Sequence, residues 1–336
     1  LKKEKFSITD EEIKQYFSIN NVLNGLFNIC KKIYGLSIHE TNASTWHEDV
    51  KFFEIFDKQK RLVGKFYLDL YARKDKRGGA WMDEAISKYK FMHEEESPVA
   101  YLTCNFTPPS NSKAYLTHDE VITLFHEFGH GLHHLLTEVT EYSISGIKGV
   151  EWDAVELPSQ FMENYCWEWS VIRDMSYNKK TNTYMPKKLF NNLLESKNFQ
   201  SGLQTLRQVE FALFDIKLHT EYSPKNRSFM KILNNVRAQV SVINTPTWNK
   251  FPHSFSHIFS GGYASAYYSY KWAEVLSADA YSLFEEIGIL SKTAGNKFKK
   301  EILSKGGSRT AMESFIAFRG RKPKINALLT HHGLTN

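Results

Sequence analysis

The stretch THDEVITLFHEFGHGLHHLL, residues 117–136, decides the fold of the region around it. Thr117 is followed three residues later by Glu120, a capping-box pattern that marks the first turn of a helix. Apolar residues then recur every three or four positions, as they do on one face of an α-helix. We therefore predict a helix from about His118 to Glu138.

Two histidines of this helix have the spacing of metal ligands. His126 and His130 are four residues apart, so both imidazoles can reach one zinc ion, and Glu127 lies beside the first of them. A carboxylate in that place can take a proton from a metal-bound water. One alternative is a purely structural polar cluster. Another is that His133, near the same face, replaces a ligand, although three ligands on one straight helix cannot surround an ion tetrahedrally.

A catalytic zinc also needs a third protein ligand and an open position for water. The segment WDAVELPSQ, residues 152–160, offers Glu156 ahead of a second predicted helix. Glu163, seven residues later, lies on the same helical face and is expected to orient a ligand through a hydrogen bond. The alternative role for Glu156 is a helix cap, because Asp153 and Glu156 also have capping-box spacing.

The rest of the sequence predicts a mainly α fold with a small antiparallel β-sheet. Helices open the chain, and helical patterns fill the region after the sheet. Three short stretches between them are rich in aromatic and β-branched residues, which favour strands. They are Phe52–Phe56, Lys65–Tyr71 and Val99–Phe106, so we expect the sheet within about residues 50–106.

Composition excludes several classes of protein. The chain has 336 residues, 42% of them hydrophobic, and contains no uncharged apolar run long enough to span a membrane, so no membrane partner is expected. The three cysteines are far apart, which favours free thiols in a reducing compartment and a cytoplasmic location. The net charge is +6, and the basic cluster Arg319–Lys324 is typical of a solvated turn, so we expect no nucleic-acid partner.

Several longer motifs make the sequence similar to a known family. They are HEFGHGLHHLL (126–136), GIKGVEWDAVELPSQFMENYCWE (146–168), FPHSFSHIFSGGYASAYYSYKWAEVLSADAY (251–281), FYLDLYARKDKRGGAWMD (66–83), PVAYLTCNFTPP (98–109) and GGSRTAMESFIAFRGRKP (306–323). Together they resemble the M3 family of zinc metallopeptidases, which is thimet oligopeptidase-like, and within it the bacterial oligopeptidase A branch. The resemblance implies a zincin-like catalytic region over residues 1–336, with one zinc ion held by His126, His130 and Glu156, and with Glu127 as general base.

The functional roles expected for the segment HIFSGGYASAYYSY, residues 257–270, are implied by this resemblance. Tyr263, Tyr267 and Tyr270 follow the spacing of one helical face, which alone indicates simple packing. The resemblance instead implies a glycine-rich loop at the cleft, with Tyr270 and His257 stabilising the oxyanion. In addition, it implies that the substrate is contacted by Tyr263, Tyr267, Gly261 and Gly262.

The sequence therefore predicts a zinc endopeptidase that hydrolyses short peptides. We expect the strand Val99–Phe106 to offer an edge to the extended substrate. Members of the family are about twice as long, and their N-terminal helical half, the expected partner of this region, has no counterpart here. The alternative is a zinc-loaded but inactive peptide-binding module that lacks one wall of its channel.

Overall fold

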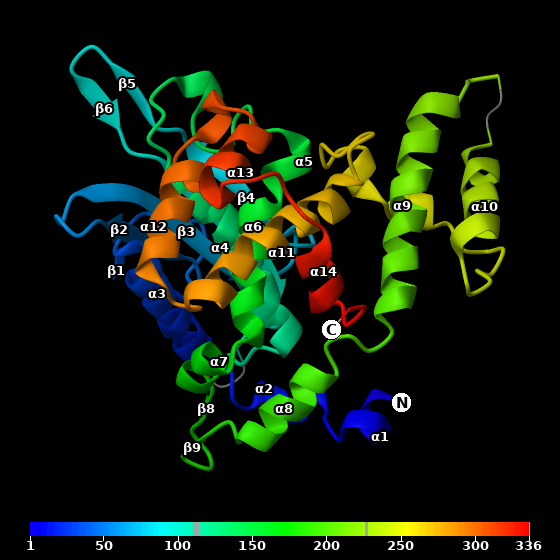
Figure 1. Ribbon diagram of the computed structural model, residues 1–336, viewed down its shortest axis with the longest axis horizontal. Helices are drawn as coiled ribbons and strands as arrows, with labels where there is room; N and C mark the ends of the chain where they lie inside the picture. Colours follow the sequence, from blue (N-terminus) through cyan, green and yellow to red (C-terminus); the bar gives the residue numbers. More distant parts are fainter. Residues whose placement is uncertain (110–113, 226–227, 336) are drawn as a thin grey trace.

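We analysed the protein in a computed structural model, which describes residues 1–109, 114–225 and 228–335. A main body holds the largest sheet and most of the helices (Figure 1). Two helices, α9 (Ser201–Glu221) and α10 (Phe229–Val240), form an arm at one side, on the right in Figure 1. None of the helices in the described ranges is long and apolar enough to cross a membrane.

The regular elements confirm a mainly helical chain. The remaining helices are α1 (Lys2–Phe6), α2 (Asp10–Lys14), α3 (Ile19–Tyr34), α4 (His118–Leu135), α5 (Trp152–Val155), α6 (Leu157–Glu163), α7 (Trp169–Met175), α8 (Lys187–Glu195), α11 (Ser269–Ile287), α12 (Lys292–Phe298), α13 (Ala311–Arg319) and α14 (Asn326–His331). The strands are β1 (Ser37–Thr41), β2 (Lys51–Phe56), β3 (Leu62–Tyr71), β4 (Trp81–Ile86), β5 (Tyr89–Phe91), β6 (Glu94–Glu96), β7 (Val99–Phe106), β8 (Tyr177–Asn178) and β9 (Thr183–Tyr184). Short helical turns are η1 (Tyr142–Ile144), η2 (Asn164–Trp167), η3 (Phe251–Ser254), η4 (Ser256–Ile258), η5 (Lys299–Leu303) and η6 (Gly306–Ser308).

The largest sheet has five strands in the order β1-β2-β3-β7-β4. The three predicted strands are present as β2, β3 and β7, but the sheet begins earlier than expected, at Ser37, because β1 pairs with β2. Three neighbouring pairs are antiparallel as predicted. The expectation of a wholly antiparallel sheet is wrong for β3 and β7, which run parallel. A long connection makes this possible, since β4 and the β5–β6 hairpin lie between these two strands in the chain.

The prediction that Val99–Phe106 offers a free edge is also wrong. This strand, β7, is paired with β3 on one side and with β4 on the other. Its own residues are nearly all buried, which the sequence pattern shows, but the pattern carries no information on which strand lies next to it. The edge strand on that side of the sheet is β4.

Helix α4 is the element that joins the sheet to the helical layer, since it packs against both β7 and α6. Its N-terminus has the predicted capping box between Thr117 and Glu120. A Cβ atom on Gly129 would lie 2.4 Å from the carbonyl oxygen of Pro158, at the start of α6. Only glycine therefore permits this close crossing, which places the middle of α4 beside the start of α6.

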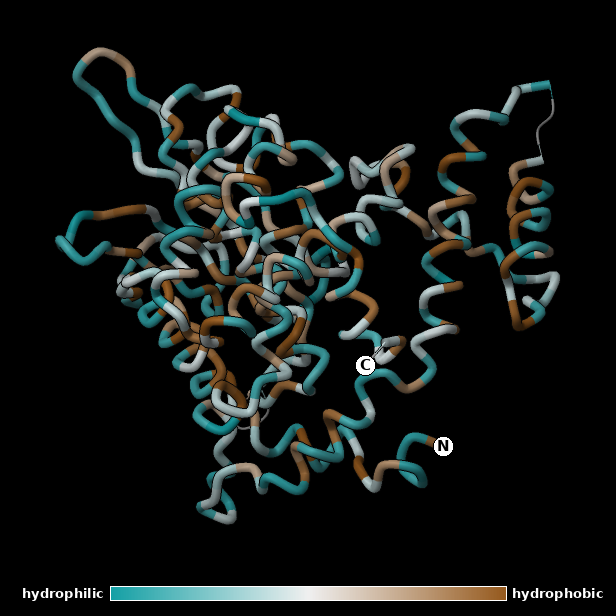
Figure 2. The backbone as a smooth tube through the Cα atoms, in the orientation of Figure 1, coloured by the Kyte–Doolittle hydropathy of each residue, from teal (hydrophilic) through white to brown (hydrophobic). Residues whose placement is uncertain are grey.

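The apolar side chains form two separate cores. The larger one, which we call the main core, is built from the sheet and the helices of the main body. The smaller one, which we call the arm core, contains Phe214 and Leu218 of α9, Leu233 of α10, and Phe255 and Ile258 from the segment after the arm. Hydrophobic and hydrophilic stretches alternate along α9 and α10 (Figure 2), as expected for helices that bury one face.

The basic cluster near the C-terminus is folded against the main body. The guanidinium of Arg321 pairs with both carboxylate oxygens of Asp279 at 2.6 Å, and Arg319 pairs with Glu286 at 2.7 Å. Asp279 is buried, so these cations neutralise a charge in the protein interior. Two of the four basic residues of the cluster are therefore used within the fold.

Candidate metal centre and active site

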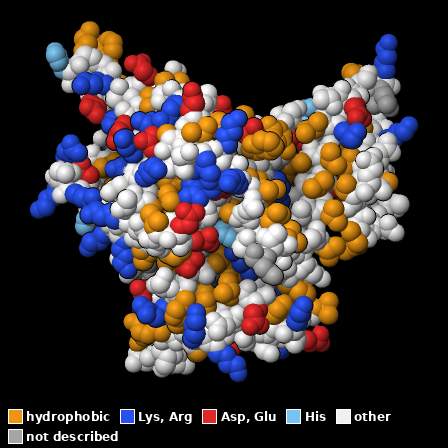
Figure 3. All heavy atoms as spheres, viewed as in Figure 1, with side chains coloured by type: hydrophobic (Ala, Val, Ile, Leu, Met, Phe, Trp, Pro, Cys, Tyr) orange, Lys and Arg blue, Asp and Glu red, His pale blue; other side chains and the backbone are white. Residues whose placement is uncertain are grey.

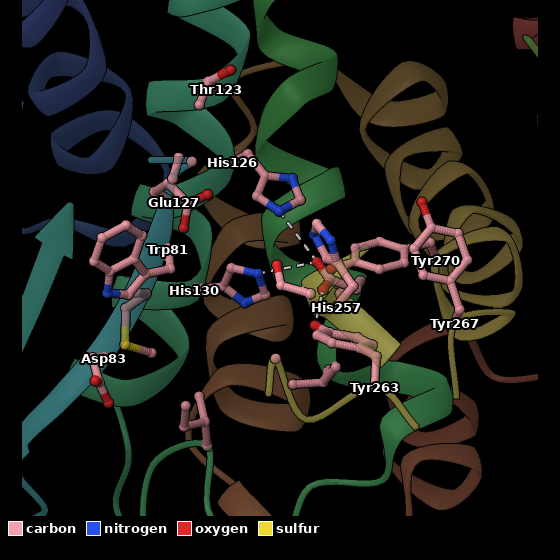
Figure 4. A pocket seen from close by; sticks show the side chains of 18 of the residues that line it. Trp81, Asp83, Thr123, His126, Glu127, His130, His257, Tyr263, Tyr267 and Tyr270 are labelled. Atoms are coloured by element: carbon pink, nitrogen blue, oxygen red, sulfur yellow. Dashed lines mark hydrogen bonds and ion pairs between the residues drawn. The ribbon is translucent and has the colours of Figure 1, made fainter. Parts of the chain in front are cut away.

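Three side chains from neighbouring helices converge at the centre of a cleft (Figure 4). His126 and His130 project from α4, and Glu156 lies at the junction of α5 and α6. The Nε2 atoms of His126 and His130 are 3.2 and 3.0 Å from Oε2 of Glu156. The three donor atoms all lie within 4.8 Å of one another, and the described residues contain no other such group of three His, Cys, Asp or Glu.

The chemistry of this group fits zinc. Glu156 is only 1% exposed, and a buried carboxylate requires a partner that offsets its charge. Although burial opposes ionisation, the neighbouring His130 and His126 hold the pKa of Glu156 well below its usual range. Two imidazole nitrogens and an ionised carboxylate oxygen are the donor set of a catalytic zinc site, with a fourth position left for water.

The first histidine is oriented by a second carboxylate, as the sequence predicts. Oε1 of Glu163 lies 2.6 Å from Nδ1 of His126. Nδ1–H can donate to this oxygen, which leaves the lone pair of Nε2 directed toward Glu156 and the space between them. Ser159 donates a further hydrogen bond to Oε2 of Glu156 at 2.9 Å. The carboxylate of Glu156 therefore faces the histidines, and no side-chain capping bond is present at the start of α5 or α6.

Glu127 lies in the same cleft without a partner. It is 5% exposed, and its Oε2 has no hydrogen-bond partner within the part of the chain that the structure describes. Burial raises its pKa, with smaller opposing contributions from His126 and His130. A buried carboxylate oxygen that no protein group satisfies, next to three metal-type donors, is placed to bind and deprotonate a water.

The cleft has a volume of about 660 Å³ and is bounded by three parts of the chain. One wall comes from the loop before β4 and from β4 itself, the floor from α4 and α5, and the opposite wall from the segment that contains His257 and Tyr263. In Figure 4 these two walls face each other across His126 and His130. This shape leaves room for an extended peptide above the metal-type donors.

The glycine-rich segment brings most of its predicted residues to the cleft. His257, Gly261, Tyr263, Tyr267 and Tyr270 all line it. The Tyr263 hydroxyl donates a hydrogen bond to Oε1 of Glu156, and its ring stacks on that of Tyr270 with centroids 4.9 Å apart. Burial raises the pKa of Tyr270, so its phenol stays protonated, and burial lowers the pKa of His257, so its imidazole stays neutral.

Gly262 has a different place from the other predicted residues of this segment. It does not line the cleft; its backbone has φ +88°, and a Cβ there would lie 3.4 Å from the ring of Trp152. Trp152 does line the cleft and contacts the ring of Tyr263 with centroids 4.6 Å apart. Gly262 therefore shapes the turn behind the wall.

The simple packing interpretation of the three tyrosines as one helical face does not hold. Only Tyr270 belongs to a helix, because α11 begins at Ser269. Tyr263 and Tyr267 lie in the irregular turns before it. Sequence spacing alone predicts a continuous helix, but the backbone between Tyr263 and Tyr267 is interrupted by Ser265, which has the left-handed φ of +58°.

His133 is not part of the donor group. Its side chain is buried, and burial lowers its pKa to about 3, so it is a neutral core residue. His133 therefore does not replace one of the three donors. Conversely, Arg77, Trp81 and Trp152 line the cleft from outside the helix motif, although no local pattern predicts them as site residues. All three stand in the segments 66–83 and 146–168, two of the motifs that carry the family resemblance.

The chain is similar to known peptidases over nearly its whole length. Residues 1–334 match the model of peptidase family M3. The chain is 52% identical over 337 aligned residues to oligopeptidase A of Salmonella typhimurium and 51% identical to oligopeptidase A of Escherichia coli, in both cases over 99% of this chain and 50% of the relative. It therefore spans about half the length of these relatives.

The fold is also similar to that of a solved peptidase. The M32 carboxypeptidase of Deinococcus radiodurans R1 superposes with a TM-score of 0.57, at 13% identity, over 96% of this chain and 60% of that protein. At this identity the likeness concerns the fold alone. The family match covers nearly every residue, and so the chain belongs to peptidase family M3.

Proposed function

We propose that residues 1–336 form one catalytic region of a zinc-dependent endopeptidase that hydrolyses short oligopeptides. The observation that carries the proposal is the convergence of His126, His130 and Glu156, with the unpartnered carboxylate of Glu127 in the same cleft. These three residues would hold one zinc ion per chain. When bound, zinc supplies Lewis acidity, which polarises a peptide carbonyl and lowers the pKa of a water molecule.

Glu127 is the general base of the proposed reaction. Its raised pKa makes it a better proton acceptor than an exposed glutamate, and its position on α4 keeps it within the cleft. It takes a proton from the attacking water and then delivers that proton to the nitrogen of the leaving amine. Glu163 keeps His126 in the tautomer whose Nε2 carries a lone pair.

Tyr270 and His257 are the proposed donors to the oxyanion. Tyr270 is protonated because burial raises the pKa of its phenol, and a neutral His257 retains one N–H donor. Both lie on the wall opposite β4, so a carbonyl bound between the walls would face them. Donors fixed before the reaction stabilise the developing charge without reorganisation.

The substrate is proposed to bind between two walls of different character. On one side, β4 has an unpaired edge and contributes Trp81 and Asp83 to the lining. An extended peptide can add to such an edge through main-chain hydrogen bonds, which predicts a broad sequence preference. On the other side, Tyr263, Tyr267 and Gly261 are the proposed substrate contacts, with Gly262 supporting them from behind.

The proposed setting of the protein is the cytoplasm. All three cysteines, Cys30, Cys104 and Cys166, are buried free thiols, as expected in a reducing compartment.

The proposed partner is an N-terminal half like that of the longer relatives, which would close the cleft. The surface contains hydrophobic side chains on the arm side of the molecule (Figure 3), including exposed Leu206 and Ile216 of α9.

The second candidate is a zinc-loaded peptide-binding module without turnover. It is favoured by one fact, which is that the chain spans half the length of its relatives. A peptide with a fluorophore and a quencher at its ends separates the two functions. Hydrolysis that stops on chelation of zinc supports the endopeptidase, whereas binding of the same peptide without hydrolysis supports the module.

A further inference from the structure

The backbone of the segment 256–268 is irregular and requires support. Gly261 is packed so tightly that a Cβ would lie 2.7 Å from Cα of His257, and Gly262 has φ +88°. Ser265 has φ +58°, a left-handed conformation that residues other than glycine rarely adopt. Such a backbone persists only where its surroundings fix it. This segment nevertheless carries six of the residues that line the cleft, among them His257, Tyr263 and Tyr267.

A buried carboxylate of the arm supplies that support. Asp215, on α9, is fully buried, and its two oxygens accept hydrogen bonds from the backbone N–H groups of Ser265 and Tyr267, each at 2.9 Å. Nδ1 of His219, one turn further along α9, lies 2.9 Å from Oδ1 of Asp215. The carboxylate therefore fixes the residues on both sides of Ala266, including the left-handed Ser265.

Apolar packing attaches the same segment to the arm. Phe255 and Ile258 belong to the arm core, and the ring of Tyr267 packs against it. Tyr267 contacts the rings of Phe211 and Phe255, with centroids 5.7 and 5.1 Å apart, and its hydroxyl donates to Oε1 of Gln208 at 3.0 Å. The metal-type donors, in contrast, stand on helices of the main core. The cleft therefore lies between two packing units.

We propose that Asp215 is a positioning residue, which holds the cleft wall carrying Tyr263 and Tyr267 at a fixed place relative to Glu156. The inference deepens the proposed function and rests on it for its effect on turnover. Asp215 does not line the cleft, so it acts through Ser265 and Tyr267. The segment continues directly into α11, where Tyr270 N–H bonds to the carbonyl of Tyr267 at 3.4 Å, so Tyr270 is positioned by the same contact.

The carboxylate is required because it faces two backbone N–H donors. Each of its oxygens accepts one backbone N–H, and a carboxylate has acceptors only. In Asp215→Asn one oxygen is replaced by an NH₂ group, which would point a donor at a donor. One of the two backbone bonds is then lost, although the side chain keeps its size.

The test compares Asp215→Asn with a matched control on the same helix. Glu210 is also buried on α9, but its carboxylate pairs with Arg207 and Arg237 and makes no contact with the segment 256–268. Glu210→Gln therefore removes a buried arm charge without touching the cleft wall. Zinc content, melting temperature, peptide hydrolysis and amide hydrogen exchange are measured for both variants.

Asp215→Asn is expected to speed amide hydrogen exchange at Ser265 and Tyr267. It should also raise KM and lower kcat by about 10- to 100-fold, because misplacing substrate-positioning groups by about 1 Å costs rates of this order. Zinc content should stay at the wild-type level, and Glu210→Gln should leave KM unchanged. A general loss of folded protein would lower kcat without changing KM, so that result would overturn the proposal. Unchanged hydrogen exchange in Asp215→Asn would overturn it as well. If the wild-type chain hydrolyses no peptide, the proposed function fails, and the exchange result still decides whether Asp215 fixes the wall.

Discussion

At the scale of single residues, Glu156 has the most demanding environment in the cleft. Its carboxylate is buried, and it accepts hydrogen bonds from Ser159 and Tyr263 while it faces His126 and His130. Without a metal, a protonated imidazole offsets this charge: although burial lowers the pKa of His126, hydrogen bonds to Glu156 and Glu163 raise it well above its usual range. A divalent cation would take the place of that proton, which is why we propose Glu156 as a metal ligand.

Replacing Glu156 by alanine should therefore release zinc. We expect the zinc affinity of Glu156→Ala to fall by at least about 100-fold, because the loss of an inner ligand exceeds the 10- to 100-fold typical for outer-shell partners. Competition with a chromophoric chelator measures this directly. Glu138→Ala, at an exposed position just beyond α4, is the control that should keep its zinc. Full zinc retention in Glu156→Ala would remove this residue from the ligand set.

Replacing Glu127 should reduce the rate of peptide hydrolysis without reducing zinc binding. Glu127→Gln keeps the shape of the side chain but removes the base, so we expect kcat to fall by about 10² to 10⁴. Zinc content and melting temperature should stay near the wild-type values. Turnover close to wild type in this variant would show that another group accepts the proton.

Replacing Tyr270 distinguishes a catalytic role of its hydroxyl from a packing role of its ring. Tyr270→Phe retains the ring that stacks on Tyr263 and removes only the hydroxyl. If the hydroxyl donates to the oxyanion, kcat should fall by about 10² to 10³ with little change in KM. Steady-state kinetics, with melting temperature as the control for packing, give the answer. An unchanged kcat would make Tyr270 a packing residue, and a change in KM alone would make it a substrate contact.

The sequence predicts the donors on α4 well because their spacing is local. A helix places residues four positions apart on one face wherever it lies in the fold, so His126 and His130 could be paired before any tertiary structure was available. Arg77 and Trp81 reach the cleft only because β4 pairs with β7 beside α4. No local pattern contains that information.

At the scale of elements, the crossing of α4 over the start of α6 sets the distance between the two histidines and Glu156. Gly129 permits this approach, since a Cβ would lie 2.4 Å from the carbonyl oxygen of Pro158 and 2.5 Å from Cα of Ser159. Both of these are backbone atoms directly after Glu156. An added methyl group would therefore push apart the two elements that carry the proposed zinc ligands.

Gly129→Ala should accordingly lower both stability and zinc affinity. Overpacking of this kind costs about 1–3 kcal/mol of unfolding free energy, despite the better helix propensity of alanine. Urea denaturation and chelator competition measure the two effects. Gly202→Ala on α9 is the control, because nothing lies within 4 Å of its Cβ position and the substitution should be neutral or stabilising. A stable Gly129→Ala protein with normal zinc affinity would show that the crossing of the two helices can accommodate a methyl group.

Element types were easier to predict than element partners. The strands β2, β3 and β7 have the expected aromatic and β-branched composition, and they were found. β1 and β4 are less buried and more polar, so their sequences do not stand out from loops. The parallel pairing of β3 with β7 depends on the long connection between them, which a strand-by-strand reading does not resolve.

At the scale of the whole molecule, the cleft lies between the main core and the arm core. The main core carries the metal-type donors, and the arm core carries the wall with Tyr263 and Tyr267. The two sets meet where Tyr263 donates to Glu156. This division predicts that zinc affinity depends mainly on the main body, with a smaller contribution from Tyr263, whereas turnover depends strongly on how the arm holds its wall.

We propose that one zinc ion, held by His126, His130 and Glu156, makes this cleft an endopeptidase. The most direct test is a titration of the metal-free protein with zinc while the cleavage of an end-blocked oligopeptide is followed by mass spectrometry. We expect internal cleavage at a rate that rises in proportion to zinc and levels off at one equivalent per chain. Cleavage that is independent of zinc, or a fully zinc-loaded protein that binds the peptide and leaves it intact, would contradict it.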